Sequence, residues 1–349
     1  MLINDQFFMQ RALQLASLGQ GNVAPNPMVG CVIVHDNKII GEGFHQKYGQ
    51  AHAEVNAVAS VKDKTLLAQA TVYVTLEPCS HFGKTPPCAD LLLKHQVKKV
   101  VVCNLDSNPL VGGQGIAKLK AAGVEVQTGI LEAKGRALNR RFFTFIEQKR
   151  PYIILKWATS SDGLIAKPNY KAVDISGALA KRYVHQWRSQ EAGIIVGTRT
   201  AKYDNPRLDV RYWTGNSPTR IVVDRTLLLP DNLHLFDEKI PTIRYNLLKN
   251  STLPNNQTVQ LSELSVQEII KNLYQQKIQS VIVEGGTALL SSFIESNLWD
   301  EARVLTSPIQ LKSGIIAPKL AQTPKQILNI GVDQLAVYEF GRNSCLMLK

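Results

Sequence analysis

The stretch from Gly49 to Cys88 constrains this chain more than any other, because it sets one histidine, one glutamate and two cysteines in order. His52-Ala53-Glu54 comes first, Pro78-Cys79 follows, and Cys88 ends the stretch. One imidazole and two thiolates supply three ligands for a tetrahedral Zn²⁺ and leave the fourth position open for water. Glu54 stands two residues after His52, where it can handle the protons of that water. The stretch therefore predicts a zinc site with His52, Cys79 and Cys88 as ligands.

Each of these residues also has a simple structural interpretation, as a buried polar group or a small apolar thiol. The combination is more specific, because the order matches the H-x-E…P-C signature of zinc-dependent deaminases. In that signature the glutamate is a general acid/base and not a metal ligand. We therefore predict a deaminase with Glu54 as its catalytic residue. A regulatory module with a structural zinc is less consistent, because structural sites usually have four protein ligands.

Size and composition set the broad class. A chain of 349 residues with 44% hydrophobic residues fits two globular domains. No run of 18 apolar residues predicts a membrane span, and the N-terminal residues do not resemble a secretion signal. Five cysteines, an odd number, favour a reducing compartment, and we expect the cytoplasm.

The net charge of +12 suits anionic partners. The basic residues are scattered and are not interleaved with aromatic residues, so we expect phosphorylated small molecules and not nucleic acid or a membrane. A tRNA or nucleoside deaminase with an accessory domain is the rival enzyme interpretation.

Alternating strand and helix patterns predict an α/β chain of two domains, a three-layer domain over 1–148 and a second over 149–349. Lys149-Arg150-Pro151 interrupts the pattern. In the first domain we expect a hairpin at 29–44, a strand at 71–76, and helices at 9–18, 51–61, 88–95 and 131–146. In the second we expect helices at 177–188, 266–275 and 287–296, and strands at 152–155, 193–197, 220–224, 280–284, 302–306, 335–339 and 344–348. Residues 228–262 give no clear pattern.

Two glycine-rich turns precede predicted helices. Gly112-Gly113-Gln114-Gly115 lacks the Lys-Ser/Thr of a P-loop, so a loop without a nucleotide is the better interpretation. Glu284-Gly285-Gly286-Thr287 follows an apolar strand and would let a phosphate approach free backbone N–H groups at a helix N-terminus. This pattern is weak alone, because a closely packed strand–helix turn explains it equally well.

The spacing of the two thiols limits which class of deaminase, and so which substrate, the chain can be compared with. Many deaminases have Cys-x-x-Cys, whereas eight residues separate Cys79 and Cys88 here. The run from Thr75 to Cys88 (TLEPCSHFGKTPPC) resembles the deaminase of riboflavin biosynthesis, as do residues 25–32 (PNPMVGCV) and 49–54 (GQAHAE). This resemblance implies a diaminopyrimidinone substrate that carries a phosphoribosylamino group. It also implies substrate contacts from Asn26, His45, His81 and Lys84.

The second half is similar to the reductase domain of the same bifunctional family. The likeness lies in Lys156…Ser160-Ser161-Asp162-Gly163, in Thr200…Asp204-Asn205-Pro206-Arg207-Leu208, and in Glu284-Gly285-Gly286-Thr287. It implies a dihydrofolate-reductase-like fold, NADPH as cofactor, and a dimer formed through this domain. The implied substrate residues are Lys156, Ala172, Arg188, Leu208, Arg211 and Glu284. The implied cofactor residues are Ala158, Asp174, Thr200, Asp204, Gly286, Thr287, Ala288, Leu289, Leu290, Ser291 and Ser292.

The chain departs from the family at one cofactor position. The family usually has Trp-Ile-Thr-Ser before the helix, where this chain has Asp174-Ile175-Ser176-Gly177. The missing tryptophan normally packs near the cofactor. The leading interpretation is a bifunctional zinc deaminase and NADPH reductase, and the alternative is a deaminase with a weak or silent reductase-like domain. The sequence does not distinguish NADPH from NADH.

Overall fold

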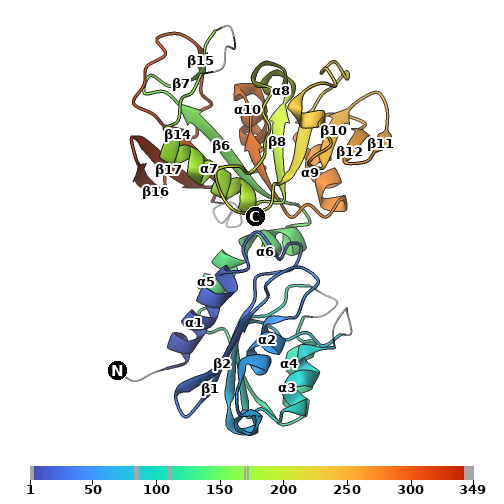
Figure 1. Cartoon of the computed structure of the whole chain (residues 1–349), viewed down its shortest axis with the longest axis vertical. Coiled ribbons are helices and arrows are strands. Elements are labelled where there is room, and N and C mark those ends of the chain that lie inside the picture. Colours follow the sequence, from blue (N-terminus) through green and yellow to red (C-terminus); the bar gives the residue numbers. More distant parts are fainter. Residues whose placement is uncertain (1–3, 82–85, 109–111, 169, 171–172, 342–349) are drawn as a thin grey trace, which may run out of the picture. The chain divides into compact units, whose positions relative to one another are not determined.

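The computed structural model describes residues 4–81, 86–108, 112–168, 170 and 173–341. The chain divides into two compact units, Met1–Lys149 and Arg150–Lys349. Each unit has its own main sheet (Figure 1) and its own buried hydrophobic clusters. None of the helices in the described ranges has the length and apolarity of a membrane span. The strand expected at 344–348 lies outside the described residues.

Unit 1 is built on a mixed sheet of five strands in the order β2-β1-β3-β4-β5. β1 pairs antiparallel with β2 and β3, whereas β3, β4 and β5 run parallel. The strands are β1 (Gly30–His35), β2 (Lys38–Phe44), β3 (Thr71–Leu76), β4 (Lys99–Asn104) and β5 (Glu125–Thr128). Central strands β3 and β4 are buried on both faces, as their continuous β-branched runs predict.

Helices cover both faces of this sheet, which gives the three layers expected (Figure 1). α2, α3 and α4 contribute to the core on one face, and α1 and α5 cover the other. The helices are α1 (Asp5–Ser17), α2 (Ala53–Ser60), the 3₁₀ helix η1 (Lys64–Gln69), α3 (Cys88–Lys94), α4 (Gln114–Ala121), α5 (Glu132–Leu138) and α6 (Arg140–Gln148). The side chain of Asn4 caps α1 by accepting from the Phe7 N–H.

The single helix expected over 131–146 is wrong, because the structure has two helices, α5 and α6, that meet at Asn139. The side chain of this buried asparagine accepts from the Met28 N–H and donates to the Met28 carbonyl, both at 2.8 Å. These bonds tie the junction to the segment before β1. A contact across 111 residues thus ends a helix that the local pattern would continue.

Close contact between α2 and the hairpin brings the first part of the zinc motif onto the sheet. A Cβ on Gly43 of β2 would lie 2.3 Å from the Ala57 nitrogen and 2.6 Å from the Ala53 carbonyl oxygen. Only glycine permits this approach. The N-terminus of α2 is thereby held against the strand that leads to His45.

Unit 2 contains a sheet of ten strands in the order β11-β12-β10-β9-β8-β13-β6-β14-β17-β16. The strands from β12 to β14 in this order run parallel, and the outer ones pair antiparallel. They are β6 (Tyr152–Thr159), β8 (Gly193–Gly197), β9 (Thr219–Val223), β10 (Thr242–Asn246), β11 (Ser251–Leu253), β12 (Asn256–Gln260), β13 (Ser280–Glu284), β14 (Glu301–Thr306), β16 (Gln326–Ile330) and β17 (Asp333–Glu339). β7 (Leu164–Ala166) and β15 (Ile315–Ile316) form a separate pair.

Helices pack on both faces of the large sheet and form two cores. α9 (Val266–Gln275) and α10 (Thr287–Glu295) pack on one face, and α7 (Ala178–Gln190) and α8 (Thr198–Asp204) on the other, with the 3₁₀ helix η2 (His234–Phe236). Successive buried residues of β6, β8 and β13 point into alternate cores, as Ile153 and Ile154 do. Parallel strands covered on both faces explain the uninterrupted apolar runs of this half.

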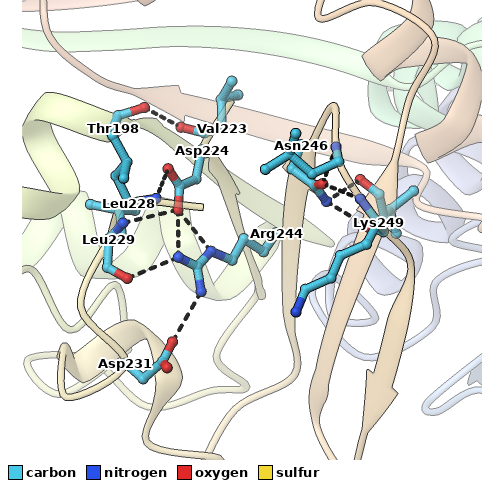
Figure 2. A network of polar contacts seen from close by, with 11 residues as sticks. Thr198, Val223, Asp224, Leu228, Leu229, Asp231, Arg244, Asn246 and Lys249 are labelled. Atoms are coloured by element: carbon cyan, nitrogen blue, oxygen red, sulfur yellow. Dashed lines mark hydrogen bonds and ion pairs between the residues drawn. The ribbon is translucent and has the colours of Figure 1, made fainter. Parts of the chain in front are cut away.

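The stretch 228–262 contains η2, β10, β11 and β12, and a polar network holds it to β9 (Figure 2). Asp224, directly after β9, accepts from the backbone N–H groups of Leu228 and Leu229 and from Arg244 of β10. Arg244 also donates to the Leu229 carbonyl at 2.8 Å. Asp224 and Arg244 are nearly buried, so this ion pair fixes the turn after β9.

Candidate functional site

Three elements of unit 1 bring the expected metal ligands together. His52 is the N-terminal cap residue of α2, Cys79 follows the end of β3, and Cys88 is the first residue of α3. His52 Nδ1 lies 3.3 Å from Cys88 Sγ and 3.6 Å from Cys79 Sγ. All three ligand atoms lie within 4.8 Å of one another. Two donors of a tetrahedral zinc site are separated by about 3.6 Å, so this donor set fits one Zn²⁺.

The electrostatics of the Cys79 thiol also suit a metal site. The Cys88 thiol and His52 stabilise the Cys79 thiolate and hold the pKa of Cys79 well below its usual value. The backbone N–H of Cys88 adds a hydrogen bond to Cys79 Sγ at 3.3 Å. Cys31 and Cys103 lie in strands and are buried, as expected for core residues.

Glu54 lies in the first turn of α2, and its residue is 3% exposed. Burial, with the nearby Cys79 sulfur, raises the pKa of Glu54 to about 7. A carboxyl group with such a pKa can both accept and release a proton near neutral pH. Its position beside the three ligand atoms is the one that the sequence motif predicts.

A cavity of about 290 Å³ opens in front of this group, lined by Asn26, His45, His52, Glu54, Cys79 and His81 among others. His45 Nδ1 lies 3.0 Å from the Ala51 carbonyl oxygen, so it donates there, and Nε2 accepts from Asn26 Nδ2 at 3.2 Å. Burial lowers the pKa of His45 and so favours its neutral form. Lys84, the fourth expected substrate residue, lies outside the described residues.

Sequence reasoning missed several residues that line this cavity, among them Tyr48, Glu77 and Asp106. Glu77 and Asp106 follow the ends of the parallel strands β3 and β4. Polar residues at the carboxyl ends of parallel strands are common ligand-binding positions. Applied to the sequence, this rule could have predicted that Asp106 lies at the site.

In unit 2 a cluster of charges lies where β6, β13 and α7 meet. Glu284 ends β13 beside Lys156 of β6, its partner in the strand pairing. Arg188 of α7 donates to both Glu284 carboxylate oxygens at 2.9 Å, and Lys156 Nζ lies 3.7 Å from Oε2. Burial opposes ionisation, but the two cations outweigh it and lower the pKa of Glu284 to about 2.

This cluster forms one wall of a cavity of about 700 Å³. Most expected substrate and cofactor residues line the cavity: Lys156, Ala158, Asp174, Arg188, Thr200, Asp204, Arg211, Glu284, Gly286, Thr287, Ala288 and Leu289. Leu208 and Leu290 are instead buried in the core. Ser291 and Ser292 lie further along α10 and do not line it. Ala172 lies outside the described residues.

The cavity fits an anionic dinucleotide at the N-terminus of α10. Gly286 is the cap residue, its N–H donates to Thr200 Oγ1 at 3.1 Å, and as a glycine it adds no side-chain capping hydrogen bond. Lys181 and Arg199 line the same cavity and supply positive charge. A helix N-terminus with free backbone N–H groups favours phosphate.

The position of the missing tryptophan is polar. Asp174 forms an ion pair with Lys181 of α7. Aromatic surface is present elsewhere in the cavity, where the rings of Tyr170 and Tyr203 stack at 4.8 Å. His185, missed by sequence reasoning, also lines it and accepts the Arg211 N–H at 3.1 Å.

Comparisons with known proteins identify the family of both domains. The family model described as RibD C-terminal domain matches residues 151–336, and the one described as cytidine and deoxycytidylate deaminase zinc-binding region matches residues 2–104. The chain is 36% identical to the riboflavin biosynthesis protein RibD of Aquifex aeolicus, over 96% of this chain and 98% of that one. It is 34% identical to RibD of Escherichia coli, over 95% and 98%.

Solved structures give the same result. Acinetobacter baumannii RibD superposes with a TM-score of 0.87 at 35% identity, over 96% of this chain and 98% of that one. A Thermotoga maritima diaminohydroxyphosphoribosylaminopyrimidine deaminase/5-amino-6-(5-phosphoribosylamino)uracil reductase gives the same four values. These matches confirm the predicted α/β fold, with an N-terminal cytidine-deaminase-like domain and a C-terminal reductase domain.

Proposed function

Because the chain belongs to the RibD family of riboflavin biosynthesis proteins, we propose that it catalyses two consecutive reactions of that pathway. The first is the zinc-dependent hydrolytic deamination of 2,5-diamino-6-(5-phosphoribosylamino)pyrimidin-4(3H)-one. The second is the NADPH-dependent reduction of the ribosyl group of 5-amino-6-(5-phosphoribosylamino)uracil to ribityl. The observation that carries the proposal is the convergence of His52, Cys79 and Cys88 beside buried Glu54.

In the deaminase, His52, Cys79 and Cys88 would hold one Zn²⁺, which supplies Lewis acidity and makes water acidic enough to react at neutral pH. Glu54 takes one proton from the attacking water and delivers it to the ring nitrogen, and it then carries the second proton of that water to the amino group, which leaves as ammonia. Asn26 presents both a donor and an acceptor group to the pyrimidine edge. Neutral His45 fixes the Asn26 amide through their hydrogen bond.

In the reductase, NADPH supplies the hydride, and this chain orients the reactants. The N-terminus of α10 would hold a phosphate of the cofactor, with Thr200 fixing the Gly286 turn. Arg188 and Arg211 would hold the substrate phosphate, for which the guanidinium fork is well suited. The Lys156–Glu284 pair would contact the ribosyl group from the wall of the same cavity.

Two further properties belong to the proposal. A reducing compartment such as the cytoplasm keeps Cys79 and Cys88 reduced, so that both can bind metal as thiolates. A homodimer through unit 2 is supported by strand β16 at the edge of the large sheet, where Ile327 and Leu328 are exposed. Exposed edge strands pair readily with another chain.

The test follows ammonia release from the diamino substrate and NADPH oxidation with the deaminated substrate, using the zinc-loaded full chain. Both signals are expected. Ammonia release without NADPH oxidation would instead support the alternative, a silent reductase domain caused by Asp174 at the tryptophan position. Absence of ammonia release would refute the deaminase. NADH in place of NADPH serves as the cofactor control.

A further inference from the structure

Glu77 follows the last residue of β3 and precedes the metal ligand Cys79 by two residues, and it is 6% exposed. Both of its carboxylate oxygens accept backbone N–H groups of a distant segment. Oε2 accepts from Asp106 at 3.3 Å and Gly113 at 2.9 Å. Oε1 accepts from Gly115 at 2.9 Å and Ile116 at 3.3 Å. The N-terminus of α4 thus satisfies this buried charge through N–H groups and its dipole.

The same contact explains the glycine-rich turn that has no nucleotide motif. Gly113 caps α4 with φ +81°, a conformation that favours glycine. A Cβ on Gly115 would lie 2.0 Å from the Pro78 carbonyl oxygen. The turn therefore lies directly on the backbone of Pro78, the residue before the ligand Cys79.

Cys79 itself follows the end of its strand, so other contacts must set its position. On one side, Cys88 and Ala89 of α3 donate to Cys79 Sγ and to its carbonyl oxygen. On the N-terminal side of Cys79, the contacts among the described residues that hold the backbone are the hydrogen bonds of Glu77 and the packing of Pro78 against the turn before α4. Glu77 also holds the backbone of Asp106, which lines the cavity.

We propose that Glu77 is a positioning residue of the deaminase site, which holds Cys79 in register with His52 and Cys88 and sets Asp106 in the cavity wall. This inference rests on the proposed deaminase function. Glu77 does not transfer protons or bind the metal in this role, because each of its oxygens already accepts two N–H groups. Groups that orient metal ligands from behind typically change metal affinity or activity 10–100-fold when they are replaced.

The test compares Glu77→Gln with the wild-type full chain. A glutamine keeps the shape, but its NH₂ group cannot accept the two N–H groups that one carboxylate oxygen accepts. Zn²⁺ affinity is measured by competition with a chromophoric chelator, and the ligand geometry by the absorption spectrum of the Co²⁺-substituted protein. We expect Zn²⁺ affinity to fall at least about tenfold, with a changed Co²⁺ spectrum. NADPH oxidation by the second domain should be unchanged.

A second pair of variants separates positioning from general destabilisation. Gly115→Ala leaves Glu77 intact but forces the turn away from Pro78, so it should reproduce the metal-binding loss. Gly123→Ala, after the other end of α4, strains the backbone at φ +86° without any atom within 4 Å of the new Cβ. It should lower stability and leave Zn²⁺ affinity and the Co²⁺ spectrum unchanged. If Glu77→Gln does not fold, the inference is tested by the difference in Zn²⁺ affinity between Gly115→Ala and Gly123→Ala.

Wild-type Zn²⁺ affinity and an unchanged Co²⁺ spectrum in folded Glu77→Gln would overturn the inference. So would equal losses in Gly115→Ala and Gly123→Ala. A wild-type chain that binds no Zn²⁺ would instead overturn the proposed function itself, which is a distinguishable result.

Discussion

The charge cluster of unit 2 allows a quantitative prediction for Glu284→Gln. The substitution keeps the volume of the side chain but leaves Arg188 and Lys156 buried without their common anion. Removing one partner of a buried ion pair costs about 3–5 kcal/mol, because the remaining charge is uncompensated. We therefore expect a large loss in the unfolding free energy of this unit at pH 7.

The pKa of Glu284 gives an independent value for the contribution of its carboxylate to the unfolding free energy. It is lowered to about 2 from an ordinary value of 4.5, and this difference corresponds to about 3 kcal/mol of stability at neutral pH. Because the folded state favours the carboxylate, the contribution is complete above pH 4.5 and is lost as the pH falls towards 2. The difference between wild type and Glu284→Gln should shrink by more than half between pH 7 and pH 3.

Urea unfolding followed by tryptophan fluorescence isolates this unit. All four tryptophans, Trp157, Trp187, Trp213 and Trp299, lie within Arg150–Lys349. The matched control is Glu268→Gln, which removes an exposed i,i+3 pair with Lys271 and should cost less than about 0.5 kcal/mol. A loss below about 1 kcal/mol for Glu284→Gln at pH 7, or a loss independent of pH, would refute the reasoning.

Three other predictions follow from the structure. Cys88→Ser should abolish tight Zn²⁺ binding and ammonia release while NADPH oxidation continues, and retained Zn²⁺ affinity would contradict the ligand set. Asp224→Asn should lower the unfolding free energy of unit 2 by about 3 kcal/mol in urea, because it breaks a buried pair with Arg244, and a loss below 1 kcal/mol would contradict that role. Leu328→Lys should shift the proposed dimer towards monomer in light scattering, and an unchanged mass would exclude β16 as the interface.

The convergence of the candidate zinc ligands could be predicted from the sequence, because a zinc motif depends on residue type and order. The motif needs only four residues, which are His52, Glu54, Cys79 and Cys88. The apolar pattern between them predicts a buried strand, and Cys79 follows the end of that strand. The parallel strands of unit 2 could also be predicted from the sequence, because their apolar runs are continuous. The neighbouring positions of Lys156 and Glu284 then follow from the pairing of β6 with β13.

Other features depend on contacts between distant segments and could not be predicted. The break at Asn139 depends on Met28, and the turn at Gly113 depends on Glu77. Neither partner is visible in the local pattern. The strands β11 and β12 lie near an exposed edge, so they carry no continuous apolar run that would reveal them.

The ligand set of unit 1 spans 36 residues between His52 and Cys88 and joins α2, the end of β3 and α3. A bound ion therefore links three segments of the folded unit, and it stabilises the fold because the unfolded chain does not hold the three ligands together. At a free metal concentration a thousandfold above Kd, such linkage adds about 4 kcal/mol to folding. The supply of zinc in the cell would then govern how long this half of the protein survives proteolysis, as well as whether it reacts.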